Sequence, residues 1–171
     1  MTQLEKFIHE HGEELLRLAY IYVKNKQAAE DIVQDVLLKA FEKQASFRGE
    51  AMYRTYLYRV TINRSYDYLR SWHYKNTIVG EKIHRLFGRS TEQVVVIESE
   101  NRQLAQAVLA LPLKYREVIV FTYYLDYSSE EIGTLLNCSP ATVRTRLARG
   151  REKLKSVLKE DGFDGTIENG Y

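Results

Sequence analysis

The chain of 171 residues has a single cysteine, Cys138, and only four histidines, which are scattered along it. One cysteine excludes an internal disulfide, and no Cys/His cluster has the spacing of a zinc site, so we expect no metal and no cofactor. The sequence also lacks a paired nucleophile and base and a glycine-rich loop that would hold phosphates. An enzyme is therefore not indicated.

Long apolar runs are also missing, since none approaches the ~18 residues that a membrane-spanning helix needs. The first residues, MTQLEKFIHE, do not resemble a secretory signal, and we expect a cytoplasmic protein without membrane insertion. Proline is rare, at Pro112 and Pro140 only, and most segments show i, i+3, i+4 apolar spacing. These features predict an all-α fold.

The periodicity divides the chain into two small helical domains joined by a flexible linker. From Ser71 to Ser99 the pattern loosens, with two glycines and a β-branched run at 94–97 that fits no helical face. The end of the chain carries four acids, no base and three glycines, which is typical of a frayed tail. We therefore predict domains over residues 1–72 and 100–160, a linker over 73–99 and a tail over 161–171.

The second domain carries the signals of a helix-turn-helix. The stretch EEIGTLL has apolar residues at i, i+3 and i+4, and Asn137 is suited to end that helix. Ser139 can cap a second helix that has Pro140 at its first position. Cys138 lies in the predicted turn, either as a small packing residue or as a redox-sensitive thiol.

The second helix of this motif, SPATVRTRLARGREKLK over residues 139–155, is strongly basic, with four arginines and two lysines. Its apolar face includes a glycine that permits close backbone approach, and its opposite face has small and basic side chains that suit a DNA major groove. The alternative is a solvated surface helix. The apolar face comprises Val143, Leu147, Gly150 and Leu154. The groove-facing candidates are Ala141, Arg144, Thr145, Ala148 and Arg149, and the phosphate-contact candidates are Arg146, Arg151, Lys153 and Lys155.

The first domain has two notable helical segments. In AAEDIVQDVLLKAF a broad apolar stripe is expected in the core, opposite a polar face that is either solvated or used for protein docking. Residues 48–75 combine five arginines and one lysine with six tyrosines and one tryptophan. The apolar stripe comprises Ala29, Ile32, Val33, Val36, Leu37, Ala40 and Phe41. The polar face comprises Glu30, Asp31, Gln34 and Asp35.

A helix over residues 51–70 would place Arg59, Asn63, Tyr66 and Arg70 on one stripe, opposite an apolar face that includes Tyr58. Such a stripe suits unpaired nucleic acid, because aromatic rings stack on bases, arginines follow phosphates and an amide can bond the edge of an extruded base. The alternative is that the tyrosines fill an imperfect core.

The sequence resembles the bacterial extracytoplasmic-function sigma factors over roughly residues 10–160. The likeness is carried by four segments in a fixed order: EDIVQDVLLKAF, SFRGEAMYRTYLYRVTINRSYDYLR, LPLKYREVIVFTYYLDYSSEEIG and LNCSPATVRTRLARGREKLK. It implies a protein that binds core RNA polymerase, directs it to promoter DNA and promotes promoter opening, under control of an anti-sigma factor. The linker of this family often has a net negative charge. Here residues 71–99 hold four bases and three acids, so the sequence departs from that pattern.

The resemblance also implies roles for individual residues. Asp31, Gln34 and Asp35 would bind the polymerase. Asn63 would receive a flipped base of the −10 element, with a pocket shaped by the preceding loop that includes Phe47. Arg144, Thr145, Ala148 and Arg149 would face the −35 duplex. An operator-binding dimeric regulator is the alternative, but it has no use for the aromatic and basic stripe around Asn63.

Overall fold

The computed structural model describes residues 2–46, 50–79 and 102–160, and every regular element in these ranges is a helix. The helices form two compact units, Met1–Ile97 and Glu98–Tyr171. The predicted all-α fold with two small helical domains is confirmed. Of the helices described, none combines the length and apolar character needed to cross a membrane.

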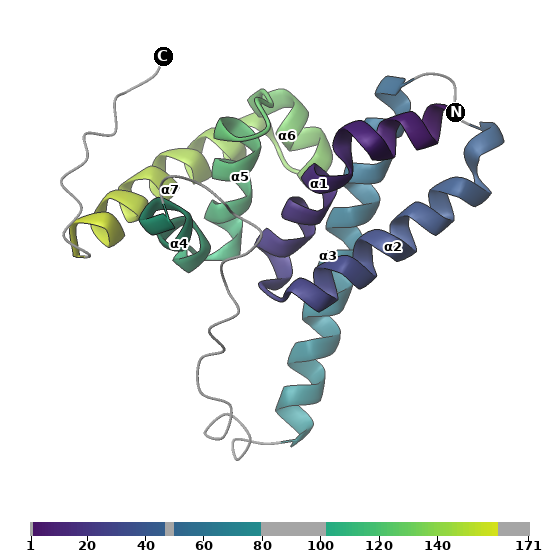
Figure 1. The fold of residues 1–171 in the computed structure, drawn as a ribbon. Helices are drawn as coiled ribbons and strands as arrows, with labels where there is room; N and C mark the ends of the chain where they lie inside the picture. Colours follow the sequence, from purple (N-terminus) through teal and green to yellow (C-terminus); the bar gives the residue numbers. More distant parts are fainter. Residues whose placement is uncertain (1, 47–49, 80–101, 161–171) are drawn as a thin grey trace. The chain divides into compact units, whose positions relative to one another are not determined.

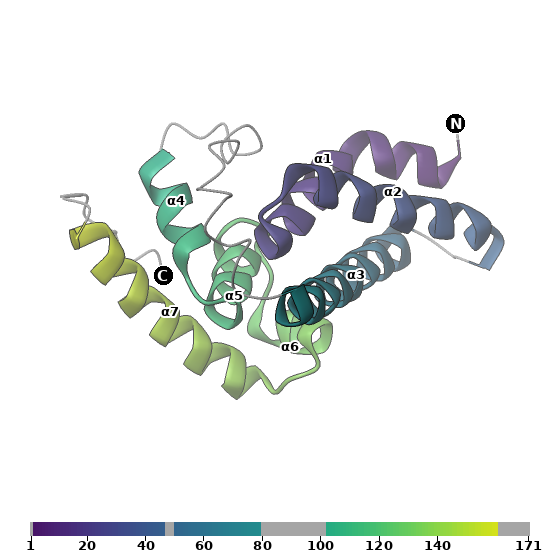
Figure 2. The same ribbon diagram turned by 90° about the horizontal axis from the view of Figure 1, so that it is seen from below.

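The first unit is a three-helix arrangement in which each long helix contacts the other two (Figures 1 and 2). The helices begin and end at local signals. Thr2 Oγ1 accepts a hydrogen bond from the Glu5 amide, and the Glu5 carboxylate accepts one from the Thr2 amide, so a capping box starts the first helix. The elements are α1 (Gln3–Val23), α2 (Lys26–Glu42), the 3-10 helix η1 (Gln44–Ser46) and α3 (Glu50–Val79).

Helix α3 is longer than the sequence predicted, because it continues past residue 72 to Val79. Residues 73–79, assigned above to the linker, are therefore helical. No glycine or proline occurs between Gly49 and Gly80, so this stretch contains no strong helix breaker. The remaining linker residues and the predicted tail lie outside the described residues.

The core of the first unit contains most of the apolar stripe predicted for α2, but not all of it. Ala29, Val36 and Ala40 are fully buried, and Leu37 is half-buried. The prediction is wrong for Phe41, whose side chain is 60% exposed. Each step of four residues rotates the stripe by about 40°, so Phe41 at the end of α2 has moved away from the core.

The second unit packs three helices against a long fourth one, α7 (Figure 1). The centre of its core lies where α7 meets α4 and α5, and it includes Ile119, Leu154 and Leu158. Pro112 separates α4 from α5, and Pro140 starts α7. The elements are α4 (Arg102–Ala110), α5 (Leu113–Tyr123), α6 (Ser129–Leu136) and α7 (Pro140–Glu160).

Candidate nucleic-acid interfaces

Helices α6 and α7 form the predicted helix-turn-helix. Helix α6 ends at Asn137, which has the left-handed backbone conformation with φ of 55°. Ser139 Oγ then accepts a hydrogen bond from the Thr142 amide at 3.1 Å, and Pro140 is the first residue of α7. The three local signals read from the sequence thus act together in one turn.

The turn depends on a glycine that the sequence reading passed over. A Cβ atom on Gly133 would lie 2.6 Å from the backbone oxygen of Cys138. The Cys138 amide also donates to the Gly133 carbonyl at 2.9 Å, so the two backbones are in direct contact. Cys138 itself is half-buried. The angle between α6 and α7 therefore requires that residue 133 have no side chain.

The apolar face of α7 packs against α5, and its residues are those that the periodicity predicted. Val143, Gly150 and Leu154 are buried, and Leu147 is half-buried. A Cβ on Gly150 would approach Ile119 Cδ1 to 3.0 Å, which confirms the predicted close backbone approach. This packing fixes which side of α7 faces outward.

The outward side of α7 carries every groove-facing candidate. One of these side chains contacts the preceding helix, because Arg144 Nη1 lies 3.7 Å from Glu130 Oε1 of α6. Both groups are largely exposed, so this ion pair contributes little stability and leaves the guanidinium accessible. The exposed candidates are Ala141, Arg144, Thr145, Ala148 and Arg149.

The predicted phosphate contacts divide into two kinds. Arg151 and Lys153 are exposed, although Arg151 Nη1 donates to the Tyr123 hydroxyl at 3.1 Å. Arg146 instead points toward the core, where its Nη1 lies 3.6 Å from an oxygen of Glu117, a side chain only 2% exposed. We therefore assign Arg146 to holding α7 on α5 and keep Arg151 and Lys153 as the phosphate candidates.

In the first unit, α3 carries the second candidate surface. Asn63, Arg59 and Arg70 are exposed, and Arg70 Nη2 lies 3.4 Å from Asp67 Oδ1. Tyr66 is half-buried and meets the ring of Tyr22 edge-on, with centroids 5.4 Å apart. The predicted stripe thus has three accessible polar side chains and one tyrosine partly held by α1. Phe47, predicted to shape the same site, lies outside the described residues.

The tyrosines of α3 do not all belong to that surface. Tyr53 and Tyr58 are 2% and 0% exposed and fill the core, as the alternative interpretation held for them. Tyr56 and Tyr68 are half-buried, and Lys43 Nζ lies 5.9 Å from the centre of the Tyr56 ring. A helical wheel distinguishes the core tyrosines from the half-buried ones only when the helices that pack on α3 are known.

The polar face of α2 is a third accessible surface. Asp31 and Gln34 are exposed, and Gln27 donates to Asp31 Oδ1 at 3.1 Å. Leu38, one turn further along the same face, is 63% exposed, and Phe41 lies near it. The sequence reading missed Leu38, although its place four residues after Gln34 puts it on the polar face of the helix. We call Asp31, Gln34, Leu38 and Phe41 the α2 face.

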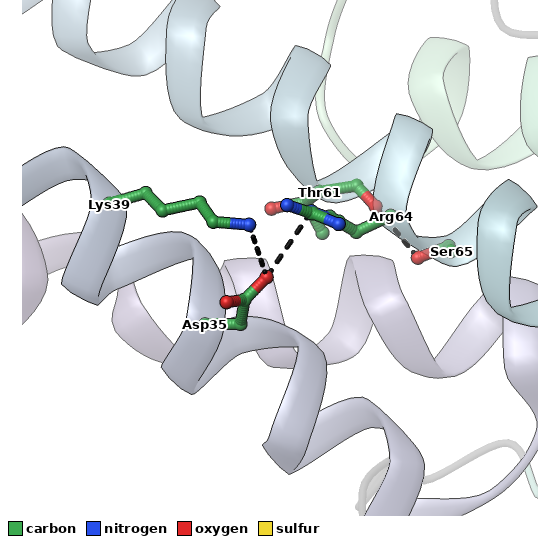
Figure 3. A network of polar contacts seen from close by, with 5 residues as sticks. All are labelled: Asp35, Lys39, Thr61, Arg64 and Ser65. Atoms are coloured by element: carbon green, nitrogen blue, oxygen red, sulfur yellow. Dashed lines mark hydrogen bonds and ion pairs between the residues drawn. The ribbon is translucent and has the colours of Figure 1, made fainter.

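Asp35 differs from its neighbours on α2 because its carboxylate is already bound within the chain. Figure 3 shows Oδ2 shared by two cations, Lys39 Nζ at 2.9 Å and Arg64 Nε at 3.2 Å. Arg64 belongs to α3, so this contact joins two helices. It also lies one residue from Asn63, in the middle of the stripe described above.

Two sequence families match the chain, one in each unit. Residues 7–73 match the family described as Sigma-70 region 2, and residues 101–154 match Sigma-70, region 4. The first range contains α2 and the stripe of α3, and the second contains the helix-turn-helix up to Leu154. The matched ranges thus include the three candidate surfaces.

Individual relatives match over most of their length. The chain is 32% identical over 160 residues to the ECF RNA polymerase sigma factor SigW of Bacillus subtilis, covering 88% of this chain and 86% of that protein. It is 28% identical to RNA polymerase sigma factor SigV of the same organism, with 90% of each chain covered. It is 27% identical to the ECF RNA polymerase sigma factor SigM of Mycobacterium tuberculosis, covering 90% and 76%.

Two solved structures share the fold. One is the sigma factor RpoE in complex with the anti-sigma factor NepR from Bartonella quintana, with a TM-score of 0.73 at 23% identity, covering 92% of this chain and 97% of that one. The other is CnrH in complex with the cytosolic domain of CnrY, with a TM-score of 0.63 at 25% identity, covering 92% and 88%.

Proposed function

Because the chain belongs to the extracytoplasmic-function RNA polymerase sigma factors, we propose that its three exposed surfaces bind polymerase, unpaired promoter DNA and duplex promoter DNA. The protein is an alternative sigma factor that directs RNA polymerase to promoters. The family comprises transcription initiation factors rather than enzymes, and membership removes the alternative of a dimeric operator-binding regulator. Because the protein acts on polymerase and promoter DNA, we expect it in the cytoplasm.

The outward side of α7 binds the −35 duplex. A major groove admits a helix, and arginine recognises guanine through two parallel hydrogen bonds, worth about 1 to 3 kcal/mol of discrimination. Arg144 and Arg149 supply such groups, while Thr145 and Ala148 are small enough to let the helix approach the bases. Arg151 and Lys153 lie nearer the C-terminal end of α7 and meet phosphates, which fixes position without reading sequence.

The stripe on α3 binds the −10 strand after it separates. Asn63 is exposed and offers an amide that can donate to and accept from the edge of one base. Arg59 and Arg70 lie along the same side and follow the phosphates. Extruding a base costs a few kcal/mol, and contacts made only to the extruded base lower that cost. The protein therefore favours the open promoter by differential binding.

The α2 face binds core polymerase. Its acid and amide are combined with two apolar side chains that are 63% and 60% exposed, Leu38 and Phe41. Large apolar groups in contact with water on a helix are typical of a protein interface, where their burial favours binding. Asp35 was predicted with this surface, but its carboxylate is engaged by Lys39 and Arg64.

An anti-sigma factor is the expected regulator. Of the two structural neighbours, RpoE is bound to the anti-sigma factor NepR and CnrH to the cytosolic domain of CnrY. We extend this mode of control to the present chain and expect an anti-sigma factor to cover one or more of its exposed surfaces.

The observation that supports this division most is that the α3 stripe and the outward side of α7 are both accessible and belong to separate units. The test is multi-round transcription by purified core polymerase on a genomic promoter library, with and without the chain. We expect new start sites that share a −35 and a −10 sequence. If a known sigma factor works in the same assay and this chain produces no new start sites, the proposal is wrong.

A further inference from the structure

The middle of α3 has small polar side chains at buried positions, next to the residue that contacts α2. Two small polar residues, Thr61 and Ser65, are completely buried there. Ser65 Oγ donates to the Thr61 carbonyl at 2.8 Å, a bond from a side chain to the preceding turn that tends to bend a helix. Among the described residues, none hydrogen-bonds the buried Thr61 hydroxyl. Asn63 lies between these two residues.

The ion pair between Arg64 and Asp35 crosses from α3 to α2 at this same turn (Figure 3). Lys39, one helical turn away on α2, contacts the same oxygen of Asp35. This contact fixes the position of the carboxylate that Arg64 binds. The side chains of Arg64 and Asp35 are 40% and 47% exposed, and such pairs are individually weak. Their importance lies in their position rather than in their energy.

A helix that rotates about its axis carries neighbouring residues with it. Arg64 follows Asn63 directly, so its side chain projects about 100° further around α3. If Arg64 is held on α2, Asn63 must point to the side where it is now exposed. Without the pair, the turn between Thr61 and Ser65 loses a contact that holds its orientation against α2. A base held by two hydrogen bonds is sensitive to such shifts, because hydrogen bonds weaken steeply with angle.

We propose that Arg64 and Asp35 form a positioning pair that presents Asn63 to the unpaired −10 strand. Arg64 acts through α3 and does not itself contact the base. Asp35 thus has a role within the protein, where it orients α3, although it lies next to the α2 face. The inference rests on the proposed function, because it assumes that Asn63 receives a nucleotide.

The chain offers a matched control for a merely structural role. Arg54 Nη2 lies 3.6 Å from Glu14 Oε1 of α1, so this pair also ties α3 to another helix. The Arg54 side chain is 38% exposed, close to the value for Arg64. Arg54 precedes Asn63 by nine residues, which corresponds to about 13 Å along a helix. Loss of either arginine removes an inter-helix tie, but only Arg64 adjoins Asn63.

The experiment measures the affinity of assembled holoenzyme for a labelled single strand that the wild-type holoenzyme has selected from a randomised pool. Each variant is used in excess over its measured dissociation constant for core polymerase. We expect Arg64→Met and Asp35→Asn each to weaken strand binding by about twofold to fivefold, the scale of an exposed ion pair. The double variant should lose no more than either single variant, because one interaction is removed in all three. Arg54→Met should bind the strand as the wild type does.

Four outcomes overturn the inference. If Arg64→Met weakens binding and Asp35→Asn does not, Arg64 contacts the strand directly. If Arg54→Met loses as much as Arg64→Met, the pair only stabilises the fold. If Asn63→Ala loses strand affinity while the Arg64 and Asp35 variants do not, the inference fails and the proposed strand surface survives. If Asn63→Ala binds as the wild type does, the strand surface itself is wrong and the inference falls with it.

Discussion

The contact between Arg146 and Glu117 leads to a prediction that separates folding from DNA binding. Glu117 is 2% exposed, Arg146 is 31% exposed, and 3.6 Å separates their charged atoms. Arg146→Met keeps a long apolar stem and removes the charge, so it leaves a buried carboxylate without this cation. We expect a large loss of stability in the second unit and little direct effect on DNA contacts.

The size of the loss follows from the burial of the two partners. Removing one member of a fully buried ion pair costs about 3 to 5 kcal/mol, because the other charge is left in a poorly solvated place. Arg146 is partly exposed, which allows some water to reach Glu117 after the substitution, so we expect about 2 to 4 kcal/mol. In a domain of this size each kcal/mol lowers Tm by about 4 to 8 °C. Adding Glu117→Gln should recover much of the loss, because the buried negative charge is then removed.

Hydrogen exchange of the full chain, read by mass spectrometry of peptides, localises the effect. Peptides from α5 and α7 should lose protection in Arg146→Met, while peptides from α1 and α2 should not. The double variant Glu117→Gln/Arg146→Met should regain protection in α5 and α7. The reasoning is refuted if Arg146→Met keeps wild-type protection but binds a −35 duplex more weakly with a smaller salt dependence, since that pattern identifies a phosphate contact.

Three further predictions concern single residues. Gly133→Ala should destabilise the second unit by about 1 to 3 kcal/mol in urea unfolding, because its Cβ would meet the Cys138 carbonyl, and an unchanged midpoint would contradict this. Arg151→Met should reduce the slope of log K against log salt for duplex binding by about 0.9 on every sequence, whereas a loss confined to one base position would mean base reading. Burial raises the pKa of Tyr20, so the folded state keeps its proton above the ordinary pKa and stability falls as pH rises beyond that value. Tyr20→Phe should therefore unfold at higher pH than the wild type, measured by circular dichroism. Unfolding of both proteins at the same pH would contradict a role of the Tyr20 hydroxyl in alkaline unfolding.

Local signals were sufficient to predict the helix-turn-helix. Asn137, Ser139 and Pro140 each act on their own backbone or on an amide three residues away, so their effect does not depend on the rest of the fold. The outward side of α7 followed from the same kind of information, because its apolar face has a clear helical period. The family resemblance was confirmed by matches in both units.

The features that the sequence did not reveal depend on distant partners. Arg146 was read as one more cation on a basic helix, and only the packing of α7 on α5 brings Glu117 beside it. Asp35 was read as part of an open acidic face, yet α3 supplies Arg64 to its carboxylate. The exposure of Phe41 likewise depends on where α2 leaves the core. For Arg146 and Asp35 the deciding neighbour is on another helix.

The central claim is that α3 holds unpaired bases while α7 holds intact duplex, and one comparison tests it most directly. Holoenzymes carrying Asn63→Ala or Arg149→Ala are assayed for open-complex formation on a fully paired promoter and on the same promoter with the −10 region already unpaired, each with and without its −35 element. Arg149→Ala should abolish the benefit of the −35 element on both templates, whereas Asn63→Ala should impair opening of the paired promoter regardless of that element. Equal effects of the two substitutions on every template would contradict the division of labour.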